Sequence, residues 1–97
     1  MLHTINKSPF SSQVLDNAIP FIGENEVVLL YEDGVLGALE GTVVSSKIKS
    51  ILAKNKVYAL QADLKARGVD KLVAGVEIVD YDGFVDLTVE HKIVNWL

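Results

Sequence analysis

The side chains best suited to chemistry in this chain are two histidines and two adjacent carboxylates. His3 and His91 are the only histidines, and no cluster of acids accompanies them to complete a metal site. Glu32 and Asp33 precede Gly34 at the expected end of a strand, where open α/β sheets often bind ligands and where paired carboxylates could act as acid and base. We favour structural roles: a polar residue of a core strand for His3, a cation at a helix end for His91, and a turn cap for Asp33.

The loop after the first expected strand is the one place where an anion could bind. Residues 6–12, Asn-Lys-Ser-Pro-Phe-Ser-Ser, offer hydroxyls and backbone N–H groups at the start of a helix. The loop contains no glycine, and the chain has no dinucleotide-binding glycine motif, P-loop or nucleophile elbow. We therefore expect no bound nucleotide, flavin or other cofactor.

The chain contains no cysteine. A disulfide, a thiolate metal site and a persulfide each need a cysteine sulfur, so none of them can form on these residues. A role in which the chain itself carries sulfur or a thiolate-bound metal is thereby excluded.

Composition indicates a small soluble domain with more apolar side chains than its core can bury. The 97 residues are enough for one domain with a modest core, and their apolar fraction of 49% exceeds what such a domain can bury, so we expect part of the surface to contact another protein. The net charge of −4 disfavours direct RNA binding. Because no apolar run reaches the ~18 residues of a membrane span and no secretion signal is evident, we expect a cytoplasmic protein without membrane contact.

Apolar runs alternate with helical periodicities along the chain. We expect strands at residues 2–5, 26–31, 56–60 and 76–79, with 93–97 as a further candidate. We expect a first helix from Ser11 or Ser12 to Pro20 and a short helix among the glycines of 34–41. Three further helices are expected at 45–54, at 63–67 before Gly68, and from Asp80 to His91. This alternation predicts an α/β fold, a mostly parallel sheet flanked by helices.

The helix expected at residues 80–91 has the clearest amphipathic pattern. Five side chains share one predicted face at the spacing i, i+3, i+4, i+7, i+8: Tyr81, Phe84, Val85, Thr88 and Val89. Asp80 can accept hydrogen bonds from the first turn. We favour core packing for Tyr81 and Phe84, with a partner interface as the alternative.

The apolar C-terminal segment is the second candidate interface. Trp96 is accompanied by Ile93, Val94 and Leu97, and exposing apolar surface costs about 25 cal/mol per Å². The segment either folds back as an edge strand or is covered by a partner, and we favour the partner because chain ends are seldom central to a core. The candidate partner interface therefore consists of Tyr81, Phe84, Ile93, Trp96 and Leu97.

Four segments of the chain resemble the TusB/DsrH family. They are Met1–Phe10 with its Met-Leu-His-Thr opening and Ser-Pro, Asp33-Gly34-Val35, Val57–Gly68, and Asp80–His91 followed by Trp-Leu. Their order and spacing agree with that family over residues 1–97, without a large insertion. The resemblance implies a single domain with a compact flavodoxin-like layer of the DsrE/DsrF/DsrH type.

The same resemblance implies a function. Proteins of this branch assemble with TusC-like and TusD-like subunits into a heterotrimer that doubles into a heterohexamer and feeds sulfur towards 2-thiouridine at the tRNA wobble position. The TusD-like subunit supplies the persulfide cysteine, which this chain lacks. We therefore expect a non-catalytic subunit that helps sulfur donor and acceptor proteins to dock. The alternatives are a free-standing flavodoxin-like protein that binds a small ligand or anion, and an acid–base enzyme using Asp33.

Overall fold

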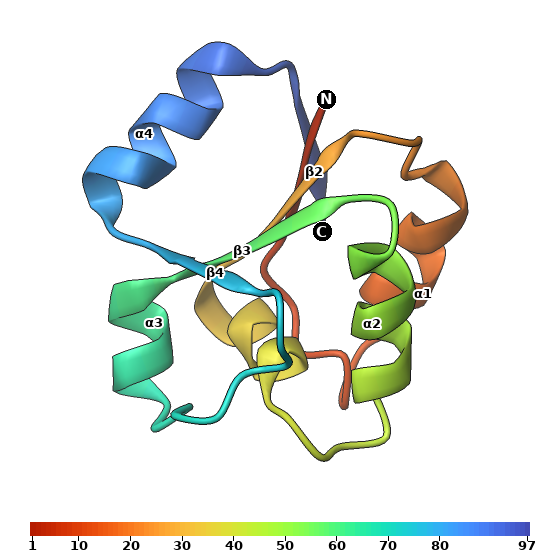
Figure 1. The fold of residues 1–97 in the computed structure, drawn as a ribbon, viewed down its shortest axis with the longest axis vertical. Helices are drawn as coiled ribbons and strands as arrows, with labels where there is room; N and C mark the ends of the chain where they lie inside the picture. Colours follow the sequence, from red (N-terminus) through yellow and green to blue (C-terminus); the bar gives the residue numbers. More distant parts are fainter.

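The computed structural model describes residues 1–97 and is organised around a five-stranded parallel sheet (Figure 1). The strand order is β4-β3-β2-β1-β5, and every neighbouring pair is parallel. The strands are β1 (Leu2–Ile5), β2 (Val27–Leu30), β3 (Lys56–Leu60), β4 (Glu77–Val79) and β5 (Ile93–Trp96). The predicted α/β fold is confirmed, and the C-terminal segment is a strand paired with β1.

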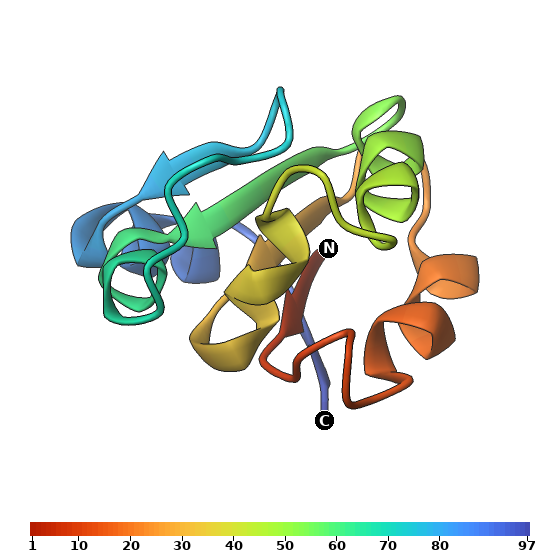
Figure 2. The ribbon, with the colours of Figure 1, turned by 90° about the horizontal axis from the view of Figure 1, so that it is seen from below.

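The helices divide unequally between the two faces of this sheet. They are α1 (Val14–Ala18), η1 (Ile19–Phe21), η2 (Glu32–Ala38), α2 (Ser45–Leu52), α3 (Gln61–Ala66) and α4 (Tyr81–Glu90). All except α4 pack on one face, while α4 alone covers part of the other (Figure 1), and Figure 2 shows the layer of the remaining helices from below. The molecule is therefore a three-layer α/β/α structure with one thick and one thin helical layer.

Alternation along the central strands creates two separate cores. Val28 and Leu30 of β2 point into a cluster of 15 buried residues beneath the thick layer, whereas Val27 and Leu29 join a cluster of only four beneath α4. Strands with both faces buried read as continuous apolar runs, which is why β2 was recognisable in the sequence.

A close approach between Gly34 and β1 fixes the start of η2. A Cβ atom at Gly34 would lie 2.1 Å from the backbone oxygen of Ile5, so only glycine fits at this point. That same oxygen accepts a hydrogen bond from the Tyr31 N–H at 3.1 Å. The short helix expected among the glycines of residues 34–41 exists, but it begins earlier, at Glu32, and is a 3₁₀ helix.

Other predicted boundaries shift by a few residues. Helix α1 begins at Val14, later than the serines expected to cap it, and ends at Ala18, where the segment around Pro20 follows as the 3₁₀ turn η1 because proline is tolerated in the first turn of a helix. Helix α3 begins at Gln61 rather than Asp63. Gly68 has a φ of 65°, the left-handed conformation predicted for the residue that ends this helix.

Candidate functional site

The carboxylates considered for acid–base chemistry meet at the carboxyl ends of the central strands. Glu32 follows β2 and adopts a left-handed φ of 48°. Its carboxylate accepts a hydrogen bond from the Asn6 side chain at 3.2 Å, and its backbone N–H donates to Asp63 Oδ2 at 2.6 Å. Glu32 and Asp33 therefore lie at the carboxyl end of a strand as expected, and Asp63 joins them as a group that sequence reasoning did not include.

Arg67, the residue directly after α3, forms ion pairs with two acids of this cluster, Asp33 and Asp63. Its Nε lies 2.9 Å from Asp33 Oδ1, and its Nη1 lies 3.5 Å from Asp63 Oδ1. The predicted cap role of Asp33 is wrong, because Asp33 lies inside η2 and pairs with Arg67 instead. With the carboxylates of Asp33 and Asp63 held by one guanidinium, the arrangement clips η2 to α3, and Glu32 is the acid of this cluster without an ion pair.

Two hydroxyls of the loop at residues 6–12 accept hydrogen bonds from nearby backbone N–H groups. Ser8 Oγ accepts the N–H of Phe10, and Ser12 Oγ accepts the N–H of Val14, both at 3.2 Å. The two surface hollows of the chain, of about 350 and 320 Å³, lie elsewhere, near the C-terminus of α2. No observation in the structure favours an anion or small-ligand site at this loop.

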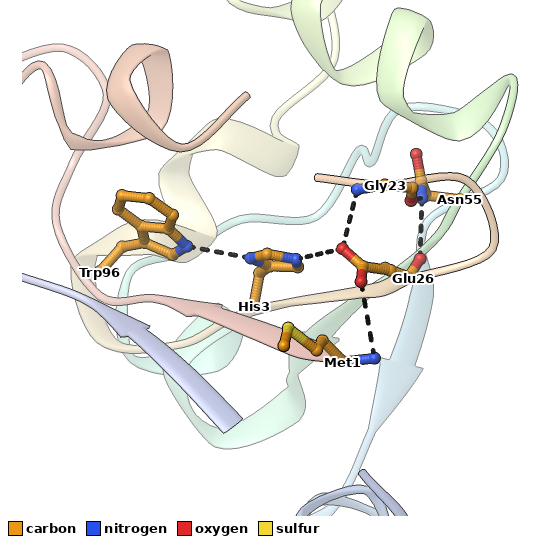
Figure 3. A network of polar contacts seen from close by, with 6 residues as sticks. All are labelled: Met1, His3, Gly23, Glu26, Asn55 and Trp96. Carbon is orange, nitrogen blue, oxygen red and sulfur yellow. Dashed lines mark hydrogen bonds and ion pairs between the residues drawn. The ribbon is translucent and has the colours of Figure 1, made fainter. Parts of the chain in front are cut away.

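His3 is the centre of a polar network in the core (Figure 3). Its Nδ1 accepts the indole N–H of Trp96 at 3.0 Å, and its Nε2 lies 2.8 Å from Glu26 Oε1. Because an indole N–H can only donate, Nδ1 must carry the lone pair and Nε2 the hydrogen. The predicted role of His3 as a polar residue of a core strand is confirmed, since it is only 2% exposed.

The network also binds Glu26 to its surroundings. The hydrogen bond from His3, followed by that from the Gly23 N–H at 2.7 Å, lowers the pKa of the Glu26 carboxyl from its ordinary value of 4.5. The N-terminal amine of Met1 lies 4.0 Å from the other carboxylate oxygen. Figure 3 shows these groups in line from Trp96 to Glu26, which joins β5, β1 and the start of β2.

His91 stands apart from this network. It is the C-terminal capping residue of α4, and its backbone N–H donates to the Leu87 carbonyl, in keeping with the predicted position at a helix end. No group of three or more His, Cys, Asp or Glu side chains comes close enough together to hold a metal ion. No helix combines the length and apolarity that crossing a bilayer requires.

Helix α4 begins as predicted, but a different side of it faces the sheet. Asp80 Oδ1 accepts the Gly83 N–H at 2.8 Å, which confirms the predicted cap. The buried residue of the helix is Leu87, flanked by half-buried Phe84 and Thr88. The predicted inward face is wrong by roughly a quarter turn, given 100° per residue, and three of its members are exposed: Tyr81, Val85 and Val89.

The five side chains predicted as a partner interface do not form one surface. Tyr81, Ile93 and Leu97 are exposed, whereas Phe84 is half-buried and stacks on Tyr31 with ring centroids 6.3 Å apart. Trp96 is half-buried against the larger core cluster, on the sheet face opposite α4. Its ring lies 5.6 Å from that of Phe21 and 6.3 Å from that of His3.

The five-stranded parallel sheet and its two helical layers define a small three-layer α/β protein, whose strand order β4-β3-β2-β1-β5 differs from the order 2-1-3-4-5 of flavodoxins. Residues 7–94 match the family described as DsrH like protein. Three curated relatives are called Protein TusB: the one from Photorhabdus laumondii is 38% identical over 93 residues, that from Escherichia coli strain K12 36% over 92, and that from Pectobacterium parmentieri 35% over 92. Each alignment covers 94% of this chain and 94% of the relative. The chain therefore belongs to the TusB/DsrH family.

Solved structures confirm the fold. The ychN protein from Escherichia coli superposes with a TM-score of 0.80 at 17% identity, and a protein of unknown function from Methanobacterium thermoautotrophicum with 0.77 at 18%. Both comparisons cover 97% of this chain and 96% of the other. At such low identity these structures establish the architecture alone.

Proposed function

We propose that this chain acts as a non-catalytic subunit of a cytoplasmic sulfur-relay complex of the TusBCD type. The observation that carries the proposal is the 35–38% identity to proteins called TusB, along 94% of the chain. The missing cysteine supports a structural or docking role, because the persulfide must then sit on another subunit. We further propose that residues 1–97 serve as one domain.

The partners in this proposal are a TusC-like and a TusD-like subunit, arranged as a heterotrimer that doubles into a heterohexamer. The complex would pass sulfur from donor to acceptor proteins and support 2-thiouridine formation at the tRNA wobble position, with no direct contact between this chain and RNA. The exposed apolar side chains of this chain support its association with other proteins. Among the proposed interface residues, Tyr81, Ile93 and Leu97 offer the most surface, while Phe84 and Trp96 contribute only their exposed rims.

Reconstitution tests the assembly. The chain is co-expressed with TusC-like and TusD-like subunits from the same genome, and the purified material is measured by light scattering coupled to gel filtration. We expect one species that contains all three chains in equal amounts. A chain that elutes as a monomer and binds neither subunit would contradict the proposal.

Complementation tests the pathway. All three subunits are introduced together into an Escherichia coli strain that lacks its own TusB, TusC and TusD, and 2-thiouridine in digested tRNA is measured by mass spectrometry. We expect the modified nucleoside to return only when this chain is present with the other two. A complex that assembles yet restores no 2-thiouridine would limit the proposal to a sulfur relay with another product.

A further inference from the structure

The side of α4 that faces solvent carries an apolar stripe. Tyr81, Val85 and Val89 follow one another at intervals of four residues, a spacing that aligns side chains along one side of a helix. They are 61%, 54% and 80% exposed. All three belong to the apolar face predicted from the sequence, for which core packing was favoured at Tyr81, and the actual orientation of the helix leaves each of them more than half exposed.

A row of acids runs parallel to this stripe. Asp82, Asp86 and Glu90 each follow a stripe residue directly, so they lie about 100° further around the helix. None of the three forms an ion pair, whereas five other carboxylates of the chain do: those of Asp16, Glu26, Asp33, Glu40 and Asp63. Since α4 contains no basic residue, its outer side carries three exposed carboxylates without an ion pair.

The position of α4 makes this surface accessible. It is the only helix on its face of the sheet, and Figure 1 shows it standing apart from the other helices. Beneath it lies the smaller core cluster, with Leu87 as the only helix residue in that cluster. The chain therefore anchors the inner side of α4, through Leu87 and Phe84, and leaves its outer side mostly exposed.

We propose that the outer side of α4 docks against a partner protein surface that presents an apolar strip bordered by lysine or arginine. The apolar stripe of α4 would pack against the apolar part of the partner surface, and the acid row would form ion pairs with the partner's lysines or arginines. The partner class rests on the proposed function, and the basic, apolar surface belongs to a TusC-like or TusD-like subunit of the relay complex.

Charge argues against the other occupants. A second copy of this chain docked through the same face would bring one acid row next to another, which is repulsive. Nucleic acid and the anionic surface of a membrane carry the same sign of charge as α4 and are repelled as well. A basic protein surface is the occupant that satisfies both the stripe and the acids.

The test uses purified chain and the co-expressed TusC-like and TusD-like subunits, with dissociation constants measured by biolayer interferometry. Two variants remove the proposed contacts: Val85→Ser/Val89→Ser shortens the stripe, and Asp86→Lys reverses one charge. Each has a matched control: Val43→Ser at an apolar position 85% exposed before α2, and Asp70→Lys at an exposed, unpaired acid after α3. Far-UV circular dichroism confirms that every variant is folded.

We expect both α4 variants to weaken binding roughly tenfold or more, as for well-buried interface contacts, and both controls to change it less than twofold. The affinity of the unmodified chain should fall as salt rises, and Asp86→Lys should show a smaller salt dependence. A complex that forms with unchanged affinity in both α4 variants would overturn this inference while leaving the proposed function intact. If the unmodified chain binds neither subunit, both fall.

Discussion

Trp96 should contribute more to folding than to partner binding, and Trp96→Ala should destabilise the isolated chain by about 3.5 kcal/mol. An aromatic side chain buries roughly 150–250 Å² when fully covered, so the mostly buried indole of Trp96 removes at least about 100 Å² from water. At about 25 cal/mol per Å² this burial contributes about 2.5 kcal/mol. The lost hydrogen bond to His3 adds about 1 kcal/mol, because His3 Nδ1 is buried and has no other donor.

Trp96→Phe separates the two contributions. Phenylalanine keeps an aromatic ring beside Phe21 but cannot donate to His3, so we expect a loss of about 1 kcal/mol. The tautomer of His3 provides an independent check on the same geometry. Two-dimensional NMR of the imidazole nitrogens should find the hydrogen on Nε2, and a hydrogen on Nδ1 would show that the bond from Trp96 does not form in solution.

Urea unfolding followed by far-UV circular dichroism measures these losses. Fluorescence is unsuitable because Trp96 is the only tryptophan, and the variants lack it. Dissociation constants with the partner subunits are measured on the same samples. An unchanged urea midpoint for Trp96→Ala, together with a large loss of partner affinity, would refute the reasoning and assign Trp96 to the interface favoured by its position in the sequence.

The remaining predictions concern Glu26, Gly34 and sulfur. Because the pKa of Glu26 is lower in the folded chain than its ordinary 4.5, the stability that its carboxylate adds is present above that pH and fades below it, so thermal melts of wild type and Glu26→Gln should converge as the buffer becomes more acidic. Gly34→Ala should destabilise the fold by about 2 kcal/mol or more, whereas Gly37→Ala, whose Cβ would meet Pro9 at 3.4 Å, should cost much less; equal urea midpoints for the two would count against the close approach. Incubation with a persulfide donor should add no reducible sulfur to the isolated chain, and a mass gain of one sulfur atom, reversed by dithiothreitol, would contradict the non-carrier role.

The parallel sheet was predictable because its pattern is local. Val27 to Leu30 is apolar at every position, which only a strand covered on both faces requires, and helical segments separate it from its neighbours. Similarly, Asp80 indicates the start of α4, because it is a good N-cap residue directly before the helical periodicity. Which side of α4 faces the sheet was not predictable in the same way. Two adjacent stripes, one containing Tyr81 and the other Leu87, are both apolar, and only the position of the sheet decides between them.

The polar contacts depend on the complete fold. Trp96 and His3 are 93 residues apart and meet because β5 pairs with β1, a pairing that no local pattern specifies. Arg67 likewise reaches Asp33 only once α3 and η2 lie side by side. One sequence signal could have been used: Asp82, Asp86 and Glu90 recur every fourth residue, and such a row of acids indicates a solvated helix side next to the stripe of Tyr81.

The unequal layers give the acidic face of α4 its significance. The thick layer closes a core of 15 buried residues, and the His3 network ties β5 into that half of the molecule. The thin layer rests on four buried residues and a single helix, so the chain supplies little apolar burial of its own there. A partner that covers Tyr81 and Val89 would add burial where the fold is thinnest, without disturbing the residues that hold the sheet together. Separate substitutions should therefore change partner binding and fold stability independently. Val85→Ser/Val89→Ser should weaken partner binding, whereas Trp96→Ala should lower the stability of the isolated chain.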